Sequence, residues 1–279
     1  DAKKLGYPKV STLTINGVPG KKLVDSTIKL VKGTDGSVID GVTIEYTGLK
    51  SGAITRSEVS DVKITNNIIT GPSTTQTVYG IAIDSGDNGC HDILIANNVI
   101  DITGSRYVYG IDIWEEHSLS TKHSDISIVS NNITLVGTGT RMAQGIYASE
   151  IDNAIIYGNS IKVTSGGAAY GVGTDYLTNS DISNNNIEIS SSGQMAYGIT
   201  ATTSGSDITI SNNDVKATGI GAVGVGINNQ TGAEIADNTI DIEGGDYTTI
   251  TSSDSLGTAN AGILVGVGNT DVEIHGNDV

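Results

Sequence analysis

The chain has 279 residues, 37 of them glycine, with one tryptophan, three prolines and no phenylalanine. A globular core of this length normally uses Phe and Trp for bulk. Apolar content made almost entirely of Ile, Val, Leu and Ala therefore predicts thin, repeated β-layers. The formal net charge of −16 disfavours nucleic acid, anionic lipid and polyuronate as partners unless a cation bridges them. The single cysteine, Cys90, excludes a disulfide within the chain, and no apolar stretch is long enough to span a membrane.

Residues 1–35 contain little of the pattern that follows, and we expect them to form an N-terminal cap or a first irregular coil. A weak copy of the pattern comes next. In it we expect Asp40 to occupy the asparagine position of the repeat and Gly52 to occupy its glycine position.

Residues 36–279 carry an internal repeat, the first feature to test for in a chain of this composition. Asn-x-(Ile/Val) recurs at intervals of 25 to 39 residues, with an Ile three positions before each Asn. An Asp, Asn or Gly lies six positions before each Asn. The eight asparagines are Asn67, Asn98, Asn131, Asn159, Asn185, Asn213, Asn238 and Asn277.

A second repeated string, (Tyr)-Gly-(Ile/Val), lies between the asparagines, for example at Gly80, Gly110 and Gly145. Each repeat thus holds three short alternating segments separated by polar turns, and alternation is typical of strands with one buried face. Identical columns at this period favour coils stacked in parallel. The sequence predicts an all-β fold, a right-handed parallel β-helix of about eight to nine coils with three short strands per coil.

The strings Ser130-Asn131-Asn132-Ile133-Thr134 and Ala169-Tyr170-Gly171-Val172 resemble the repeats of the pectate-lyase-like superfamily. They are most similar to those of the β-helical adhesin-like surface proteins of methanogenic archaea. This resemblance covers about residues 36 to 279. It implies a secreted or cell-surface module that binds a glycan or a partner cell envelope and needs no cofactor. The chain ends on a repeat strand at Val279 without an evident cap, so we expect the β-helix to continue in a longer polypeptide.

Insertions in a solenoid become loops on one face and often carry function. The segments 85–91 and 114–124 lengthen one arm of two successive coils, and a third insertion spans about residues 243–260. The first two contain the only Cys, the only Trp and three of the four His. We therefore expect these loops to lie side by side at one edge of the solenoid.

Counted from the glycine of each coil, the residues two and four positions later face outward, and several of them are acidic or aromatic. An exposed Trp beside carboxylates and a Tyr is typical of a sugar-binding surface. The candidate ligand-binding residues are Asp84, Asp112, Trp114, Glu115, Glu116, His117, Tyr147 and Asp175.

Metal binding is left open by this pattern. Cys90, His91, His117 and His123 fall in or beside the two loops, but their spacing matches no zinc signature. If the ligand is acidic, the net charge of −16 predicts that calcium assists its binding.

Enzymatic activity on a polysaccharide, as a lyase, epimerase or glycoside hydrolase, is the alternative function, and a ligand-free structural stalk is a third. Tyr109-Gly110-Ile111-Asp112 resembles the start of the uronate-epimerase motif Tyr-Gly-Phe-Asp-Pro-His, but Ile113 and Trp114 replace its Pro and His. A lyase needs a base and a cation that neutralises the uronate, and Arg106 and Arg141 lie on a different arm. We therefore expect a binding module more than an enzyme.

Overall fold

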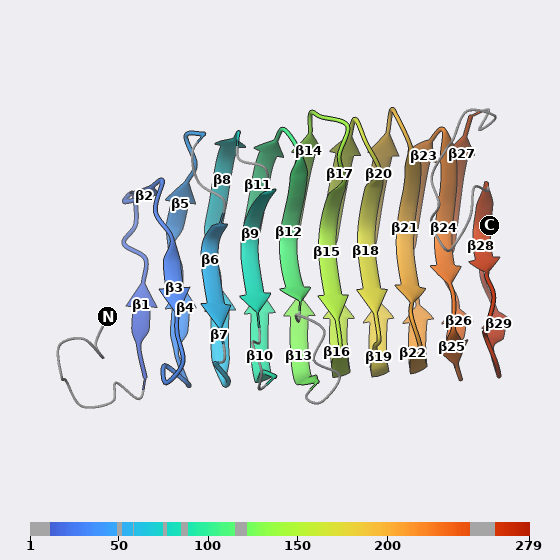
Figure 1. Ribbon diagram of the computed structural model, residues 1–279, viewed down its shortest axis with the longest axis horizontal. Helices are drawn as coiled ribbons and strands as arrows, with labels where there is room; N and C mark the ends of the chain where they lie inside the picture. Colours follow the sequence, from blue (N-terminus) through green and yellow to red (C-terminus); the bar gives the residue numbers. More distant parts are fainter. Residues whose placement is uncertain are drawn as a thin grey trace.

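The computed structural model describes residues 12–48, 52–57, 59–74, 77–84, 89–114, 122–245 and 260–279. In these ranges the chain is an all-β solenoid with three parallel sheets, and successive coils lie side by side along its length (Figure 1). The predicted right-handed parallel β-helix is confirmed. No helix with the length and apolar character that a membrane crossing requires occurs in this part of the chain.

Sheet A contains the isoleucines that lie three positions before the asparagines. Its strands are β1 (Thr14–Asn16), β4 (Val38–Asp40), β7 (Val62–Thr65), β10 (His91–Ala96), β13 (His123–Val129), β16 (Ile151–Tyr157), β19 (Thr178–Ser183), β22 (Gly205–Ser211), β26 (Glu234–Ala236) and β29 (Glu273–His275), with β25 (Gln230–Thr231) paired to β22.

In the coils of Asn67 to Asn238, the strand of sheet B begins directly after the asparagine. Its strands are β2 (Leu23–Val24), β5 (Thr43–Glu45), β8 (Ile68–Ser73), β11 (Val99–Gly104), β14 (Asn132–Gly137), β17 (Ser160–Ser165), β20 (Asn186–Ser191), β23 (Asp214–Gly219) and β27 (Thr239–Gly244).

Sheet C carries the glycine column. Its strands are β3 (Ile28–Leu30), β6 (Gly52–Ser57), β9 (Thr77–Asp84), β12 (Tyr107–Trp114), β15 (Ala143–Ser149), β18 (Ala169–Asp175), β21 (Met195–Thr202), β24 (Gly221–Ile227) and β28 (Ala261–Val265).

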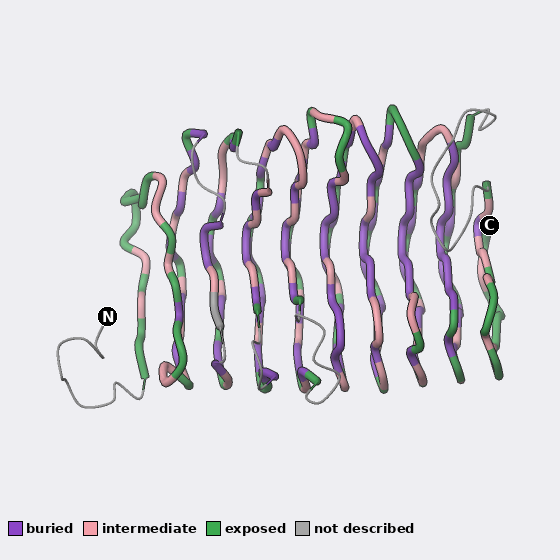
Figure 2. Tube along the Cα trace, in the orientation of Figure 1, coloured by how far each residue is buried: buried purple, intermediate pink, exposed green. Residues whose placement is uncertain are grey.

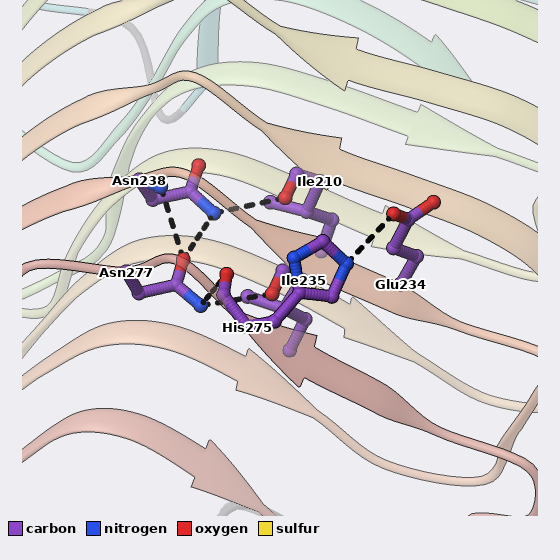
Figure 3. Close-up of polar contacts among 6 residues, drawn as sticks. All are labelled: Ile210, Glu234, Ile235, Asn238, His275 and Asn277. Atoms are coloured by element: carbon purple, nitrogen blue, oxygen red, sulfur yellow. Dashed lines mark hydrogen bonds and ion pairs between the residues drawn. The ribbon is translucent and has the colours of Figure 1, made fainter.

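The turn between sheets A and B explains the Asn-Asn string. Its first residue has a left-handed backbone, as at Asn66 (φ 56°) and Asn97 (φ 55°), a conformation that Asn, Asp and Gly adopt at least cost. Its second residue is the buried asparagine of the repeat. The Nδ2 of Asn98 donates to the Oδ1 of Asn131 (2.9 Å) and to the carbonyl oxygen of Ile64 (2.9 Å). The eight asparagines form one continuous ladder, and Figure 3 shows its last step, from Asn238 to Asn277.

The core is built from stacked columns. Ile64, Ile95 and Ile128 are consecutive partners in sheet A, and each is at most 1% exposed. The glycine column is dictated by space, because a Cβ at Gly80 would lie 2.6 Å from the carbonyl oxygen of Gly110. Burial is concentrated in the middle coils, whereas the first and last coils are largely exposed or intermediate (Figure 2).

The weak copy near the N-terminus differs from the prediction in register. Asp40 pairs with Thr65, so Val42 takes the asparagine position, and its backbone N–H donates to the Oδ1 of Asn67. Gly52 pairs with Tyr79, one residue before the glycine column, whose position Ala53 takes. Both predictions for this coil are therefore wrong. Asp40 and Gly52 were assigned to the two columns by residue type, whereas the apolar residues Val42 and Ala53 occupy those positions. Residues 14–30 form β1, β2 and β3, which pair with β4, β5 and β6.

Removing one ladder asparagine should cost as much stability as truncating a core isoleucine. Asn131→Ala leaves the backbone N–H and the Nδ2 of Asn98 without their acceptor, which corresponds to about 2–5 kcal/mol. Ile128→Ala also costs about 2–5 kcal/mol. Denaturant unfolding measures both, and the exposed neighbour Asn132→Ala is the control, with an expected change within about 0.5 kcal/mol. A loss for Asn131→Ala as small as that of the control contradicts the ladder's structural role.

Candidate functional site

A groove of about 490 Å³ lies on the outer face of sheet C, across β9, β12, β15, β18 and β21. The register of the sheet aligns Asp112 with Tyr147 and aligns Ser149 with Asp175. Positions two and four after the glycine of each coil therefore form two columns that run along the solenoid. Side chains from residues about 30 apart in sequence meet on this face.

The groove brings together four of the predicted residues: Asp112, Trp114, Tyr147 and Asp175. Asp84 pairs with Trp114 across β9 and β12 and is exposed, but it does not line the groove. The other three predicted residues, Glu115, Glu116 and His117, lie outside the described residues. So do the central parts of the three predicted insertions.

A tyrosine column that the sequence analysis did not include forms a large part of the groove. The residue directly before each glycine faces the same groove, and in five successive coils it is Tyr79, Tyr109, Gln144, Tyr170 and Tyr197. The signal was present in the Tyr-Gly-Ile string itself. It was missed because only the positions after the glycine were counted as outward.

The tyrosines stack on one another in pairs. The ring centroids of Tyr79 and Tyr109 are 5.3 Å apart, and those of Tyr170 and Tyr197 are 4.8 Å apart. Their ring faces are thus largely used in mutual contact. Trp114, which is 40% exposed, offers an aromatic surface that a ligand can reach.

Asp112 has an unusual electrostatic position. Its carboxyl group is partly buried, and no hydrogen bond or ion pair joins it to another described residue. Burial, and then the negative charge of Asp84, raise the pKa of Asp112 to about 7. The carboxyl is therefore partly protonated at neutral pH and can donate or accept a proton.

Asp175 is held by several donors. The Tyr147 hydroxyl donates to its Oδ2 (2.8 Å), and the hydroxyls of Thr202 and Thr203 donate to its Oδ1. Burial, and then the charge of Asp175, raise the pKa of Tyr147. Burial and the charge of Asp112 likewise raise the pKa of Tyr79 and Tyr109. These three phenols stay protonated at neutral pH and act as hydrogen-bond donors.

The expected surface cluster of Cys and His is not present. Cys90 and His123 are 1% and 0% exposed, and the pairing of His91 with Ser124 places them in one core column. They belong to the interior stack, so the expectation that the inserted loops carry Cys90 and His123 on the outer edge is wrong for these two residues. His91 is exposed, and its Nδ1 lies 2.8 Å from Asp92. No group of three or more His, Cys, Asp and Glu side chains suited to a metal ion occurs in the described ranges.

The described lining of the groove holds two carboxyl groups, hydroxyls, one carboxamide and aromatic rings, but no Lys, Arg or His. Arg141, next in sequence to the lining residue Met142, places its guanidinium over the ring of Tyr107 at 5.6 Å. This set can bind hydroxyl-rich ligands and exchange a proton at Asp112.

No protein-family model and no curated protein matches the sequence. Several solved structures match it in fold. The A-module of the mannuronan C-5 epimerase AlgE4 of Azotobacter vinelandii is 15% identical, with a TM-score of 0.50 over 99% of this chain and 80% of that one. A double mutant of the periplasmic alginate epimerase AlgG is 12% identical, with a TM-score of 0.42 over 96% of this chain and 76% of that one.

The endo-xylogalacturonan hydrolase of Aspergillus tubingensis is 13% identical, with a TM-score of 0.30 over 95% of this chain and 84% of that one. At such identities the likeness shows the parallel β-helix fold alone. These three proteins are named as enzymes that act on polysaccharides. What this chain binds has to be argued from its own groove.

Replacing Asp112 should change stability in a pH-dependent way. Its folded-state pKa of about 7 lies above the ordinary value of 3.8, so the folded protein loses stability as pH rises from about 4 to about 7. Asp112→Asn mimics the protonated form. The substitution should therefore raise the free energy of unfolding more at pH 8 than at pH 4. A shift of about three pKa units sets an upper limit of about 4 kcal/mol on this difference. The difference should be smaller than that limit because solvent reaches the group. Urea unfolding at both pH values measures the difference, and Asp101→Asn, which changes an exposed residue of β11, is the control. Equal effects of Asp112→Asn at pH 4 and pH 8 would refute the assigned pKa.

Proposed function

We propose that this protein binds a polysaccharide along the groove of sheet C and cleaves a glycosidic bond there, with Asp112 as the general acid. The observation that carries the proposal is the position of Asp112 in that groove, between Trp114 and the stacked tyrosines. A carboxyl group that is protonated near neutral pH in a cleft lined by aromatic rings and hydroxyls is suited to protonate a leaving oxygen.

Hydrolysis fits the groove better than elimination or epimerisation. Glycoside hydrolysis uses two carboxyl groups, one protonated and one ionised. Asp84 on the adjacent strand and Asp175 two strands away are the candidates for the second role. Lyases and epimerases must stabilise the charge that develops on a uronate, and the described lining holds no cation for that purpose. The three tyrosines with raised pKa are poor bases.

A second candidate is a binding module without turnover, as in the adhesin-like surface proteins that the repeats resemble. The observation that favours it is Trp114, which stands where the uronate-epimerase motif has histidine and offers a stacking surface instead of a proton acceptor. Both candidates place the protein outside the cell or on its surface, with a glycan or a glycan-bearing cell envelope as partner. Calcium is needed only if that glycan is acidic.

Binding and turnover separate the two candidates. In a screen of oligosaccharides followed by calorimetry and fluorescence of the single tryptophan, a hit should change the emission of Trp114. Trp114→Ala should weaken the binding measured by calorimetry by about 1–3 kcal/mol, the loss typical of a stacked aromatic anchor. A reducing-end assay with the same hit should show turnover that Asp112→Asn abolishes while binding persists.

Each result has a defined meaning. Binding without turnover supports the adhesin-like module and contradicts the hydrolase. Binding with unchanged Trp114 emission and unchanged affinity in Trp114→Ala places the site outside this groove. No binding across the screen contradicts both candidates and leaves the structural stalk. Asp101→Asn is the matched control for Asp112→Asn, because it removes one carboxylate from an exposed position of β11.

A further inference from the structure

The groove on sheet C has two unlike ends. In β9 and β12 the residues that point out of the sheet are all at least partly exposed, and Asp84 and Trp114 are the most exposed of them. In β21 every residue except the last, Thr202, is buried, and in β24 every residue is buried. Figure 2 shows the same change along the solenoid. Solvent therefore reaches the outer face of sheet C over β9 and β12 but not over β24.

An apolar cluster closes the β24 end. Met195, Tyr197 and Val223 are at most 1% exposed. They pack together as a cluster separate from the main core, and Tyr170 and Leu264 pack against them. Tyr197 and Val223 are register partners in the column directly before the glycines, whose side chains face outward. The cluster thus fills the face along which the groove would continue, and among the described residues the lining of the groove ends at β21.

The opposite end of the same column differs in sequence. Beyond Tyr197 the column continues in Val223, which adds an apolar side chain to the closure. Beyond Tyr79 it continues in Gly52 of β6, which has no side chain to place over the groove. Tyr79 is accordingly partly exposed, although it stacks on Tyr109 as Tyr197 stacks on Tyr170.

The reactive groups lie toward the open end. Asp112 and Trp114 belong to β12, and β21 is three strands further along the sheet. Because neighbouring strands are about 4.8 Å apart, the closed end is about 14 Å from β12. A linear ligand that enters over β9 and lies along the groove must therefore end, or turn away from the sheet, at Tyr197.

We propose that the groove takes the terminus of a glycan chain, with the terminal sugar at Tyr197 and the rest of the chain leaving over β9. The inference rests on the proposed function, since it names the part of a glycan that the same groove binds. A hydrolase with this groove cuts at a fixed distance from a chain end, and a binding module with this groove recognises chain ends.

The test compares free and end-capped hexasaccharides by calorimetry on the full chain. Cellohexaose, mannohexaose and N-acetylchitohexaose are each measured in three forms: with both ends free, with 2-aminobenzamide on the reducing end, and with a benzylidene acetal on the non-reducing end. A hexasaccharide that binds should tolerate one cap and lose about ten-fold or more in affinity with the other. Similar losses with both caps, or no loss with either, overturn the inference.

Two tyrosine variants locate the closed end. Tyr197→Ala removes the ring at which the groove ends, so it should raise the affinity for the excluded capped form about ten-fold. Tyr79→Ala removes the equivalent ring at the open end and should leave the ratio of free to capped affinity unchanged. Circular dichroism checks the fold of both variants, and the capping result with the wild type stands without them. No gain for a folded Tyr197→Ala overturns the role of the cluster as the end wall.

Product analysis gives a second readout wherever the reducing-end assay shows turnover. Chromatography of the first products of a long polysaccharide should show one oligosaccharide length. A ladder of lengths from the first turnovers overturns the inference, because it requires a groove that a chain can cross at both ends.

Failure of the inference is distinguishable from failure of the proposed function. If both capped forms bind as tightly as the free form and change the Trp114 emission, the groove is a glycan site that is open at both ends. If no hexasaccharide binds, the glycan function itself fails, and the inference falls with it.

Discussion

The buried asparagine ladder is the constraint on which the rest of the molecule depends. Each asparagine before Asn277 donates to the next asparagine in the ladder and to a carbonyl oxygen of the preceding coil. For Asn159 both distances are 2.9 Å. A slip of one residue in any coil would leave buried amides without partners, at about 1–3 kcal/mol for each group. The ladder therefore fixes the register of sheets A and B, and through the short turns it fixes sheet C as well.

Because the register is fixed, equivalent side chains of successive coils form a continuous surface. Once every coil is aligned, a side chain at a given position lies about 4.8 Å from its equivalents in the coils on either side. The residues directly before the glycines, mostly tyrosines, form one column, and the residues two and four positions after the glycines form two more. Side chains from all three columns line the groove. Function can then change at one coil without disturbing the others, since outward side chains contribute little to the core.

The positions of repeated residues could be predicted from the sequence, whereas the positions of residues that occur in a single copy could not. The asparagine and isoleucine columns were assigned correctly, because eight copies confirm one another, and Asp112, Trp114, Tyr147 and Asp175 followed from the same alternation. The single weak copy gave a wrong position to Asp40. Cys90 and His123 were assigned to the inserted loops because they fall outside the repeated columns, although both stack in the core. The raised pKa of Asp112 depends on burial and on Asp84 one strand away, which no spacing in the sequence expresses.

Charge, more than fold, limits which class of ligand this groove can hold. A parallel β-helix supplies rigid columns of side chains, and many unrelated functions use the same fold. An acidic polymer needs cations at the site or a bridging metal, because carboxylates on both partners repel one another at close range. Here the described lining offers two carboxyl groups and neutral donors, and the whole chain carries a net charge of −16. Burial, and then the charge of Asp84, raise the pKa of Asp112 to about 7, and the described lining holds no cation that would lower it. The same lack of cations that disfavours a uronate thus preserves the acid that a neutral glycan would need.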